Sequence, residues 1–440
     1  MGTHWAPDLD AITSLWLAKK FGGKKLREGI IEIFLREGDL LEKNASKMGI
    51  ILFDRGKGIF DHHAHMRLPL TSAILTAKAL GLIVEKKETE WNKKDLVVTE
   101  YIIRGERIKI VMNLEKLELN EAKALRRLFK KVQRSDLQGE SLDFDISDII
   151  KCMQRLNVEN REIIKIGFRI LNDCFNFSTE RLQRKNSEFQ KVFRVIFRQL
   201  LREGKEILPP KFVRYFEKLY NREFKQPLDI VEIFSSEKQK DIDEKEIFNF
   251  LKRILRFEYL DSLNYLKAAN EELPMSKRIK VKWATIITHI TDNPRFKDAA
   301  RNIAKALIVI QRNSTGHTQF FFDTKRINDK LIDALISMIR LEECLKQGRP
   351  IPRKDLRKPE WVTEIPEWYF YKAPTIPGSK NRPGRFILNG SLTSPDVPPS
   401  KLTLENLEYL TICAILYHQK FNWPKWQAQR IAQYSITPTP

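Results

Sequence analysis

The sequence of 440 residues predicts an α/β protein with three parts: an N-terminal domain on a mostly parallel sheet, a helical insertion or helical domain, and a smaller α+β domain. In the first third of the chain, short β-branched apolar runs alternate with segments of helical spacing, which is typical of parallel sheets covered by helices on both faces. From about residue 145 the apolar spacing is helical, and strand-like runs return after residue 280. We therefore place the three parts at residues 1–145, 146–280 and 281–440.

The elements expected in the N-terminal domain follow from its apolar spacing. Three segments have apolar side chains at helical intervals and predict helices: residues 11–21, 71–82 and 120–131. Two short apolar runs bounded by polar residues predict buried strands: residues 29–35 and 49–54. Two further runs, 96–103 and 107–114, are joined by a turn at Gly105 and fit either strands or short helices.

The other two parts differ from the first in texture. Residues 146–280 are rich in Phe, Leu, Lys, Arg and Glu at helical periods, with one break at Pro209-Pro210. In the last part, the apolar run 306–310 and residues 318–322 flank a turn and predict a pair of strands. Three helices are also predicted there: residues 295–306, 327–343 and 402–420. Residues 348–400 are rich in proline and aromatic residues and predict an ordered but irregular wrapping loop.

The charge of the chain favours a polyanionic partner. Lysine and arginine outnumber aspartate and glutamate by 78 to 57, a formal net charge of +21, and such an excess is typical of proteins that bind nucleic acid. The alternative is a basic surface that serves solubility or reflects a biased genome. No apolar stretch is long enough to span a membrane, and the first residues do not resemble a signal peptide. The four cysteines form no C-x-x-C pair, so we expect a reducing, cytoplasmic location.

The first candidate site is the pattern H-x-x-x-D-x-D formed by His4, Asp8 and Asp10 ahead of a predicted helix. Two carboxylates one residue apart in an extended turn, with an imidazole four residues earlier, can line one pocket. Hard divalent cations prefer carboxylate oxygen, and Mn²⁺ also accepts imidazole nitrogen. The alternative is that the aspartates only cap the helix, since Asp is a favoured N-cap residue.

The second candidate site follows the predicted strand 49–54, which ends in Asp54. The carboxyl ends of parallel strands are the usual ligand-binding edge of such sheets. The tripeptide Asp61-His62-His63 comes shortly afterwards, in a chain that has only seven histidines. An acid beside two imidazoles offers a metal ligand, a group that contacts substrate, and a carboxylate that orients a ring. The alternative is a polar turn with exposed histidines.

Together these motifs resemble the first three motifs of the DHH phosphoesterase superfamily, in their usual order. The short gap between Asp54 and Asp61 is similar to that of the Myg-type branch, whose members are 3′→5′ RNA exonucleases, more than to the RecJ-type branch with its longer gap. Asp136, within Val-Gln-Arg-Ser-Asp-Leu-Gln-Gly, resembles the fourth motif, and Thr71-Ser72-Ala73 fits the head of the helix that follows the third. The resemblance covers roughly residues 1–145 and implies the DHH fold there.

The resemblance also implies a site with two Mn²⁺ or Mg²⁺ ions. It assigns His4 and Asp8 to one ion, and Asp54 to both as a bridge. It assigns Asp10, His62 and Asp136 to the second ion. It assigns the catalytic roles to Asp61 and His63. In that assignment His63 faces the scissile phosphate, and Asp61 holds the histidines. Two cations close together lower the pKa of a bridging water and neutralise charge on phosphorus, so the implied reaction is phosphodiester hydrolysis.

DHH enzymes usually carry a second domain whose glycine-histidine turn closes over substrate, and the turn between the two strands predicted near residues 306–322 resembles it. The candidate substrate-binding residues there are Arg312, Ser314, Gly316 and His317. An ordinary hairpin turn is the alternative. Downstream, residues 353–371 interleave cations with tryptophan, tyrosine and phenylalanine, which suits single-stranded nucleic acid, although such aromatics also form cores.

The resulting hypothesis is a metal-dependent phosphodiesterase or nuclease that hydrolyses single-stranded nucleic acid, with RNA favoured and cleavage expected from an end. Two alternatives stay open. One is a phosphodiesterase for short or cyclic oligonucleotides. The other is a nucleic-acid-binding subunit of a larger ribonucleoprotein or defence complex, with residues 146–280 as the docking surface for a protein partner. No membrane partner is expected.

Overall fold

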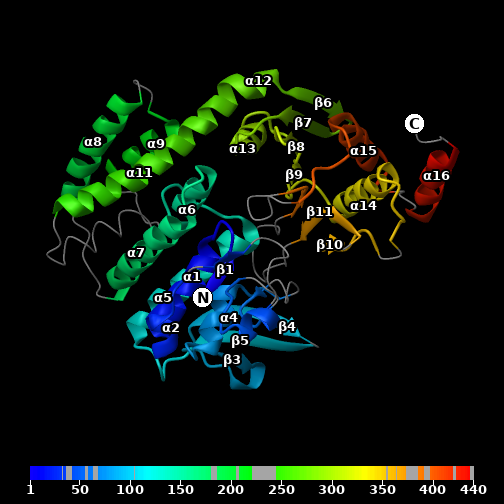
Figure 1. Cartoon of the computed structure of the whole chain (residues 1–440). Coiled ribbons are helices and arrows are strands. Elements are labelled where there is room, and N and C mark those ends of the chain that lie inside the picture. The colour runs from blue at the N-terminus through cyan, green and yellow to red at the C-terminus, as the bar shows by residue number, and fades with distance from the viewer. Residues whose placement is uncertain are drawn as a thin grey trace. The chain divides into compact units, whose positions relative to one another are not determined.

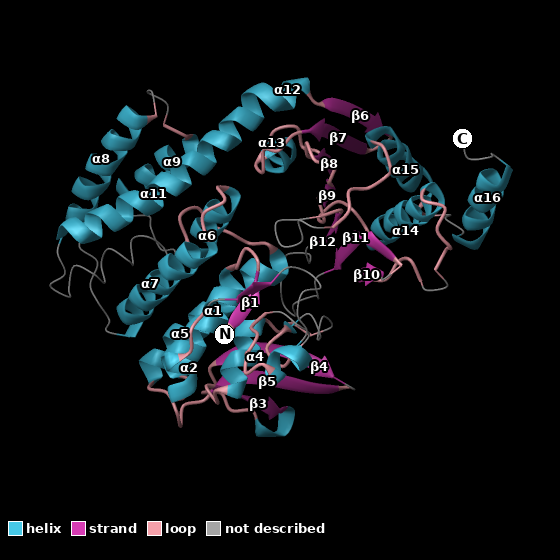
Figure 2. Cartoon of the chain, in the orientation of Figure 1, coloured by secondary structure: helices cyan, strands magenta, loops and turns pink. Residues whose placement is uncertain are grey.

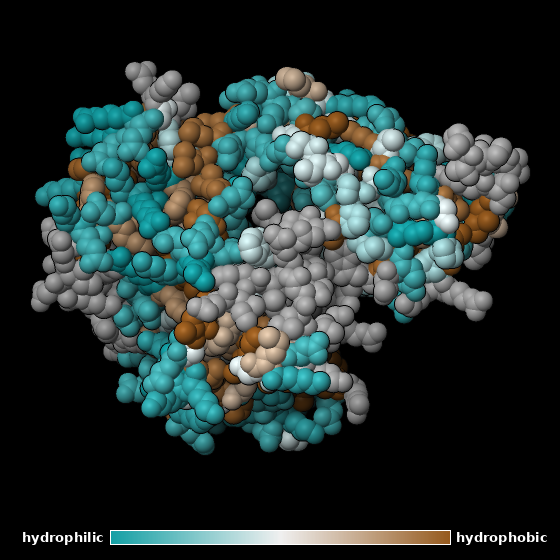
Figure 3. Space-filling view, viewed as in Figure 1, coloured by the Kyte–Doolittle hydropathy of each residue, from teal (hydrophilic) through white to brown (hydrophobic). Residues whose placement is uncertain are grey.

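The structure is a computed structural model of the whole chain (Figure 1). It describes residues 1–31, 33–35, 42–54, 58–62, 68–103, 105–179, 186–204, 208–220, 244–352, 355–362, 364–372, 385–390, 397–419 and 423–436. The described residues form two compact units, one of residues Met1–Leu263 and one that begins at Asn264. None of the helices in these ranges has both the length and the apolar character needed to cross a membrane. The face shown in Figure 3 is largely hydrophilic, with smaller hydrophobic patches.

The first unit begins with a short parallel pairing and a fully enclosed helix. Strand β1 (Gly2–His4) pairs with β2 (Ile33–Leu35) in parallel, and Gly2 also forms a parallel bridge with Leu52. Helix α1 (Leu9–Phe21) follows, and residues 9–18 of it are buried without exception. A helix that is buried all around belongs to the centre of a core, and residues 9–18 are accordingly apolar or small, with Asp10 as the one charged exception.

Helices and a three-stranded sheet surround α1 in this unit. Strands β3 (Ile83–Lys87), β5 (Glu106–Met112) and β4 (Val97–Ile103) pair antiparallel in the order β3-β5-β4. The helices of this part are α2 (Lys24–Glu28), α3 (Glu42–Lys47), α4 (Ser72–Ala79) and α5 (Leu119–Gln138). Both α4 and α5 pack against α1, so α1 joins the elements that later prove to carry the candidate site.

The helical segment after residue 145 shares the core of α1. Its described helices are α6 (Ile146–Arg155), α7 (Asn160–Thr179), α8 (Asn186–Glu203), α9 (Pro210–Tyr220) and α11 (Glu244–Lys267). Trp16 of α1 packs edge-on against Phe175 of α7 at 5.6 Å, and its indole N–H donates to Asn172. One hydrophobic cluster therefore runs from α1 through α7 to α11. Whether residues 146–280 form a domain of their own stays a prediction.

The second unit is built on a seven-stranded sheet. Its strands are β6 (Lys277–Val281), β7 (Ala284–Ile290), β8 (Ile308–Arg312), β9 (Thr318–Phe322), β10 (Glu360–Val362), β11 (Ile365–Lys372) and β12 (Arg385–Leu388). Their order is β10-β11-β12-β9-β8-β7-β6, and every neighbouring pair is antiparallel except β7 and β8. The predicted pairing of residues 318–322 with the apolar run before the turn is confirmed.

Helices cover both faces of this sheet. Successive strand residues point to opposite sides, so one strand contributes to a core on each face. Ile286 faces a cluster formed with α14 (Asp329–Lys346) and α15 (Leu404–Tyr417), which lie beside the strands in Figure 2. Its neighbour Ile287 faces a smaller cluster on the other side. The helices of that side and of the chain's end are the π-helix η3 (Ala268–Glu272), α12 (Leu273–Met275), α13 (Phe296–Asn302) and α16 (Trp423–Ile436).

The prediction of a mostly parallel sheet was wrong. Among the described residues, strands pair in parallel only at β1–β2 and β7–β8 and at the single bridge of Gly2 with Leu52. The two runs flanking Gly105 form the antiparallel hairpin β4–β5, and the turn there has φ +85° at Gly105, which favours glycine. Residues 348–400 were expected to be irregular, but they contain β10, β11 and β12. Buried aromatic residues such as Trp368 pack there as sheet core.

Candidate metal centre

His4 and Asp8 come from the end of β1 and the start of α1. Asp8 is the N-cap of α1, and its Oδ1 accepts hydrogen bonds from the backbone N–H groups of Asp10 at 2.9 Å and Ala11 at 3.1 Å. Between them Ala6 has φ +60°, a left-handed conformation that bends the loop back. This bend brings Nε2 of His4 to 3.9 Å from Oδ1 of Asp8. The capping alternative therefore holds for Asp8, and it coexists with the clustering.

Asp54 lies between two imidazole rings. Its Oδ2 is 3.3 Å from Nε2 of His4, and its Oδ1 is 3.0 Å from Nδ1 of His62. Its backbone has φ +58°, and its N–H donates to the carbonyl oxygen of Phe60. Aspartate tolerates this left-handed conformation better than most residues do, and strain of this kind is concentrated at functional sites.

The N-terminus of α4 anchors the buried carboxylate of Asp10. The backbone N–H of Ser72 donates to Oδ2 of Asp10 at 2.7 Å, and that of Ala73 donates to Oδ1 at 2.8 Å. The exposed amides and the dipole of a helix N-terminus stabilise a negative charge. The Ser72 hydroxyl donates to Oδ1 of Asp54 at 2.7 Å and lies 3.2 Å from Nδ1 of His62. Ser72 thus joins three of the predicted ligands.

Asp136 completes the cluster from α5. Its Oδ2 is 3.4 Å from Nε2 of His62, whose Nδ1 is 3.3 Å from Oδ2 of Asp10. Asp61 is buried beside them. His63 lies outside the described residues. The structure therefore brings together all six residues predicted as ligands, together with Asp61.

These residues form three overlapping groups whose potential ligand atoms lie within 4.8 Å of one another. The groups are His4, Asp8 and Asp54; Asp10, His62 and Asp136; and Asp54, Asp61 and His62. Asp54 belongs to two groups, so its two carboxylate oxygens could serve two neighbouring ions. Carboxylate oxygen with some imidazole nitrogen and no sulfur suits Mn²⁺ or Mg²⁺. The donor set thus fits the pair of ions that the sequence predicts.

The pKa values of the cluster are shifted because several carboxyl groups are buried close together. Burial, together with the charge of Asp54, raises the pKa of Asp10, and burial raises the pKa of Asp136 well above its usual range. Burial opposes ionisation of Asp54, but hydrogen bonds from His4 and His62 outweigh it and hold the pKa of Asp54 well below its usual range. Burial likewise opposes the charged form of His4, but hydrogen bonds to Asp54 and Asp8 raise its pKa to about 10. In this arrangement protonated imidazoles offset the carboxylates, a role that divalent cations can take.

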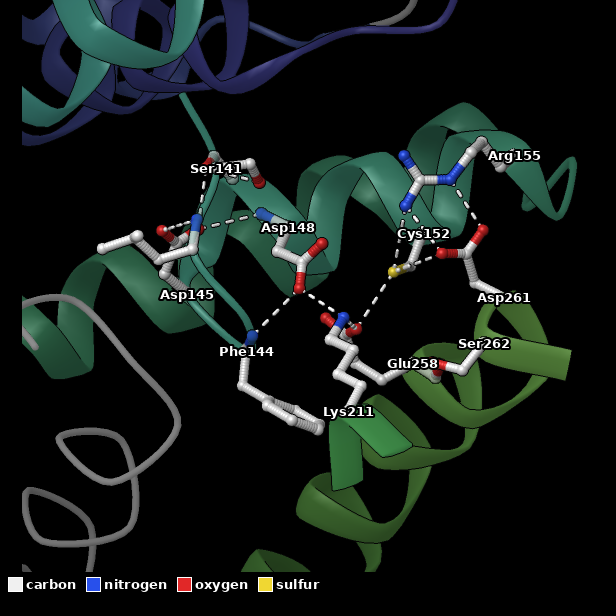
Figure 4. A network of polar contacts seen from close by, with 12 residues as sticks. Ser141, Phe144, Asp145, Asp148, Cys152, Arg155, Lys211, Glu258, Asp261 and Ser262 are labelled. Atoms are coloured by element: carbon white, nitrogen blue, oxygen red, sulfur yellow. Dashed lines mark hydrogen bonds and ion pairs between the residues drawn. The ribbon is translucent and has the colours of Figure 1, made fainter. Parts of the chain in front are cut away.

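A second group of potential ligands, Asp148, Cys152 and Glu258, lies between α6 and α11 (Figure 4). Here an amino group already supplies a cation, because the Lys211 ammonium group of α9 lies beside the carboxyl groups of both Asp148 and Glu258. The Cys152 thiol lies 3.1 Å from Oε2 of Glu258, and burial raises the pKa of that thiol well above its usual range. This group is a buried network that joins three helices, and we assign no metal to it.

The candidate substrate-binding residues lie in the second unit, at the turn between β8 and β9. The Arg312 guanidinium donates to the carbonyl oxygens of Leu402 at 2.7 Å and Ser400 at 3.5 Å. His317 Nε2 is 2.6 Å from the carbonyl oxygen of Val397. Both side chains thus hold the segment 397–402, as an ordinary structural turn would.

The other two candidates at this turn act through the backbone. The Ser314 N–H donates to Asp292, and Gly316 has φ +90°, a conformation that favours glycine. Substrate binding by these four residues stays a prediction.

Three polar residues of the first unit were not among the predicted site residues. Ser72 joins Asp10 and Asp54, as described above. Gln154 of α6 holds the loop before Asp8, and Lys151 lies one turn before Gln154. The Thr71-Ser72-Ala73 tripeptide indicated the position of Ser72 at the head of a helix. No motif near residues 151–154 indicated a contact with residues almost 150 positions earlier in the chain.

No protein-family model, no curated protein and no solved structure matches this chain. The resemblance to DHH phosphoesterases therefore depends on the motifs alone, and the geometry of the cluster carries the functional argument.

Proposed function

We propose that this chain is a two-metal phosphodiesterase that hydrolyses single-stranded nucleic acid, RNA above all, from one end. The observation that carries the proposal is the position of Asp54 between His4 and His62, at 3.3 and 3.0 Å, inside a buried cluster of carboxylates. The six residues that the DHH resemblance implies as ligands lie around this point, although Asp136 is 82 positions beyond Asp54 in the chain.

The position of each residue in the cluster indicates its role in metal binding or substrate access. Two bound divalent ions would supply a water of lowered pKa and would neutralise charge on the phosphate. Asp10 is fixed by two N–H groups of α4, so its carboxylate is oriented before any ligand arrives. Asp8 is the most exposed member, with a side chain 39% exposed, so substrate would approach on its side.

The polymeric substrate is favoured by charge. A formal net charge of +21 attracts phosphate backbones through counterion release, whereas a dinucleotide gains little from so large a basic surface. Phosphate contacts by arginine and lysine away from the cluster would hold the strand while its end is cleaved.

The test is a cleavage assay on end-labelled single-stranded RNA, single-stranded DNA and dinucleotides with Mn²⁺. The key variant is Asp8→Asn, because asparagine caps a helix as well as aspartate does but lacks the carboxylate charge. The matched control is Glu115→Ala, which removes an exposed acid of the same unit. Laddering of RNA from one end by the wild type and the control, with a loss of at least about 100-fold in Asp8→Asn, supports the proposal.

The other outcomes separate the alternatives. Activity confined to dinucleotides would replace the polymer nuclease by a phosphodiesterase for short oligonucleotides. Tight binding of RNA with no Mn²⁺-dependent cleavage of any substrate would reject the enzyme and favour a binding subunit.

A further inference from the structure

Helix α6 holds the loop that joins His4 to Asp8 through the side chain of Gln154. Gln154 Nε2 donates hydrogen bonds of 3.0 Å to the carbonyl oxygens of both Ala6 and Pro7, immediately before Asp8. Residues three apart are neighbours on a helix surface, so Lys151 lies beside Gln154 on this face. This face of α6 therefore borders the Asp8 side of the metal cluster.

Lys151 is a partly buried cation without a partner among the described residues. In the described part of the chain its ammonium group forms no hydrogen bond and no ion pair. The charged neighbours on α6 are engaged elsewhere, Asp148 with Lys211 and Arg155 with Asp261. A charge partly removed from water without a hydrogen-bonding partner costs free energy, which an anionic ligand would recover.

The surroundings of Lys151 also place it near the cluster. Burial and the charge of Arg155 lower the pKa of Lys151, while the negative charges of Asp148, Asp145 and, most weakly, Asp8 act in the opposite direction. Asp8 is thus close enough to influence this ammonium group. A phosphate held at the cluster would bring negative charge beside the Asp8 carboxylate, and a cation at this place would offset that repulsion.

We propose that Lys151 binds a non-bridging oxygen of the phosphate group that is held at the metal cluster. The identity of the ligand rests on the proposed function, whereas the position and the unpaired state of the lysine do not. Lysine binds phosphate as a flexible point charge, so it can follow the group through the reaction. In this role Lys151 touches the substrate, and Gln154 acts only by fixing the loop.

The experiment titrates inorganic phosphate into the full chain with saturating Mg²⁺ and follows binding by calorimetry. The variants are Lys151→Met, which keeps the length and apolar stem, and Lys151→Arg, which keeps the charge. The matched control is Lys165→Met, which removes an exposed and unpaired lysine from α7. We expect phosphate to bind roughly 10- to 100-fold more weakly to Lys151→Met, and within a few-fold of wild type to the other two variants.

Two further measurements exclude a structural explanation. Mn²⁺ binding, measured by the loss of the free-ion electron paramagnetic resonance signal, should be the same in Lys151→Met and wild type. If Lys151 is purely structural, Lys151→Met will instead lower the melting temperature and leave the phosphate affinity unchanged. That result overturns the proposal. So does wild-type protein that binds no phosphate.

The outcomes for Lys151 and for the proposed function are separate. If wild type hydrolyses RNA with Mn²⁺ and Lys151→Met retains the same kcat/KM and phosphate affinity, the role of Lys151 is rejected and the nuclease stands. If wild type hydrolyses nothing but binds phosphate, and Lys151→Met does not bind it, the nuclease is rejected and the anion site stands.

Discussion

The hydroxyl of Ser72 donates a hydrogen bond of 2.7 Å to Oδ1 of Asp54, the carboxylate that lies between His4 and His62. The same residue uses its backbone N–H to hold Asp10. One serine at the start of α4 thus orients two carboxylates that enter the cluster from different segments. Such outer hydrogen bonds fix the geometry of metal ligands, and their loss typically weakens metal binding.

Ser72→Ala tests this relationship. The variant keeps the N–H groups that hold Asp10 but frees Asp54, so Mn²⁺ affinity should fall roughly 10- to 100-fold. Calorimetric titration of Mn²⁺ measures the change. Ser262→Ala is the control, because among the described residues its buried hydroxyl donates to the backbone of Glu258 in the preceding turn of α11 and to no other group. Equal Mn²⁺ affinity in the two variants would contradict a positioning role for Ser72.

Metal binding should stabilise the first unit. Buried carboxylates that repel one another gain from cations, and ligand at about 100 times its dissociation constant adds roughly 2.7 kcal/mol to the free energy of unfolding. We therefore expect Mn²⁺ to raise the melting temperature by roughly 5 °C, and chelation to reverse the rise. Asp54→Asn should abolish this shift, since asparagine accepts φ +58° but lacks the charge. A shift of equal size in Asp54→Asn would show that the ions bind elsewhere.

The clustering of the residues proposed as ligands could be predicted because they occur in motifs that resemble those of a known family. His4, Asp8 and Asp10 are separated by one bent loop and the first turn of a helix, so spacing alone nearly determines their proximity. Asp136 required more, since it depends on how α5 packs on α1. Gln154 could not be predicted, because its hydrogen bonds to Ala6 and Pro7 exist only once α6 has docked on that loop.

The fold was harder to predict than the clustering of these residues, because alternation of apolar residues identifies strands but not their partners. The runs flanking Gly105 were recognised as candidate strands, yet their pairing is with each other and with β3 rather than across helices. Strand β3 has only five residues, of which Ile83 alone is buried, so its sequence shows no clear period. In residues 348–400 the many prolines led to the prediction of an irregular loop, although Trp368 and its neighbours lie in a strand.

The network between α6 and α11 should make stability depend on pH through Glu258. Burial, with the charge of Asp148, raises the pKa of Glu258 from 4.5 to about 8. Between these values the unfolded chain loses the proton and the folded chain keeps it, so the free energy of unfolding falls as the pH rises. Glu258→Gln resembles the protonated form and should melt several degrees above wild type at about pH 8 but not at about pH 4.5.

The comparison needs an acid that is not buried. Glu217→Gln on α9 is suitable, because this side chain is exposed and forms no ion pair among the described residues. Its melting temperature should follow that of wild type at both pH values. If Glu258→Gln also does so, Glu258 is ionised in the folded protein and Lys211 balances its charge together with that of Asp148.

The buried ion pair between Lys131 of α5 and Asp145, the N-cap of α6, should be the most sensitive electrostatic contact near the site. Asp145 also accepts from the backbone N–H of Asp148 at 2.9 Å and that of Leu142 at 2.8 Å. Asp145→Ala leaves Lys131 buried without its partner and removes the cap, so unfolding should become easier by roughly 3–5 kcal/mol. Denaturation by urea measures this difference.

Asp143→Ala is the matched control for that measurement, because Asp143 lies in the same loop and its side chain forms no hydrogen bond or ion pair with a described residue. It should change the free energy of unfolding by less than about 0.5 kcal/mol. A double variant, Lys131→Met with Asp145→Asn, separates the two causes. Asparagine keeps the cap, and methionine removes the unpaired charge, so much of the lost stability should return. If the double variant is as unstable as Asp145→Ala, the loss comes from packing at the α5–α6 junction and not from the uncompensated lysine.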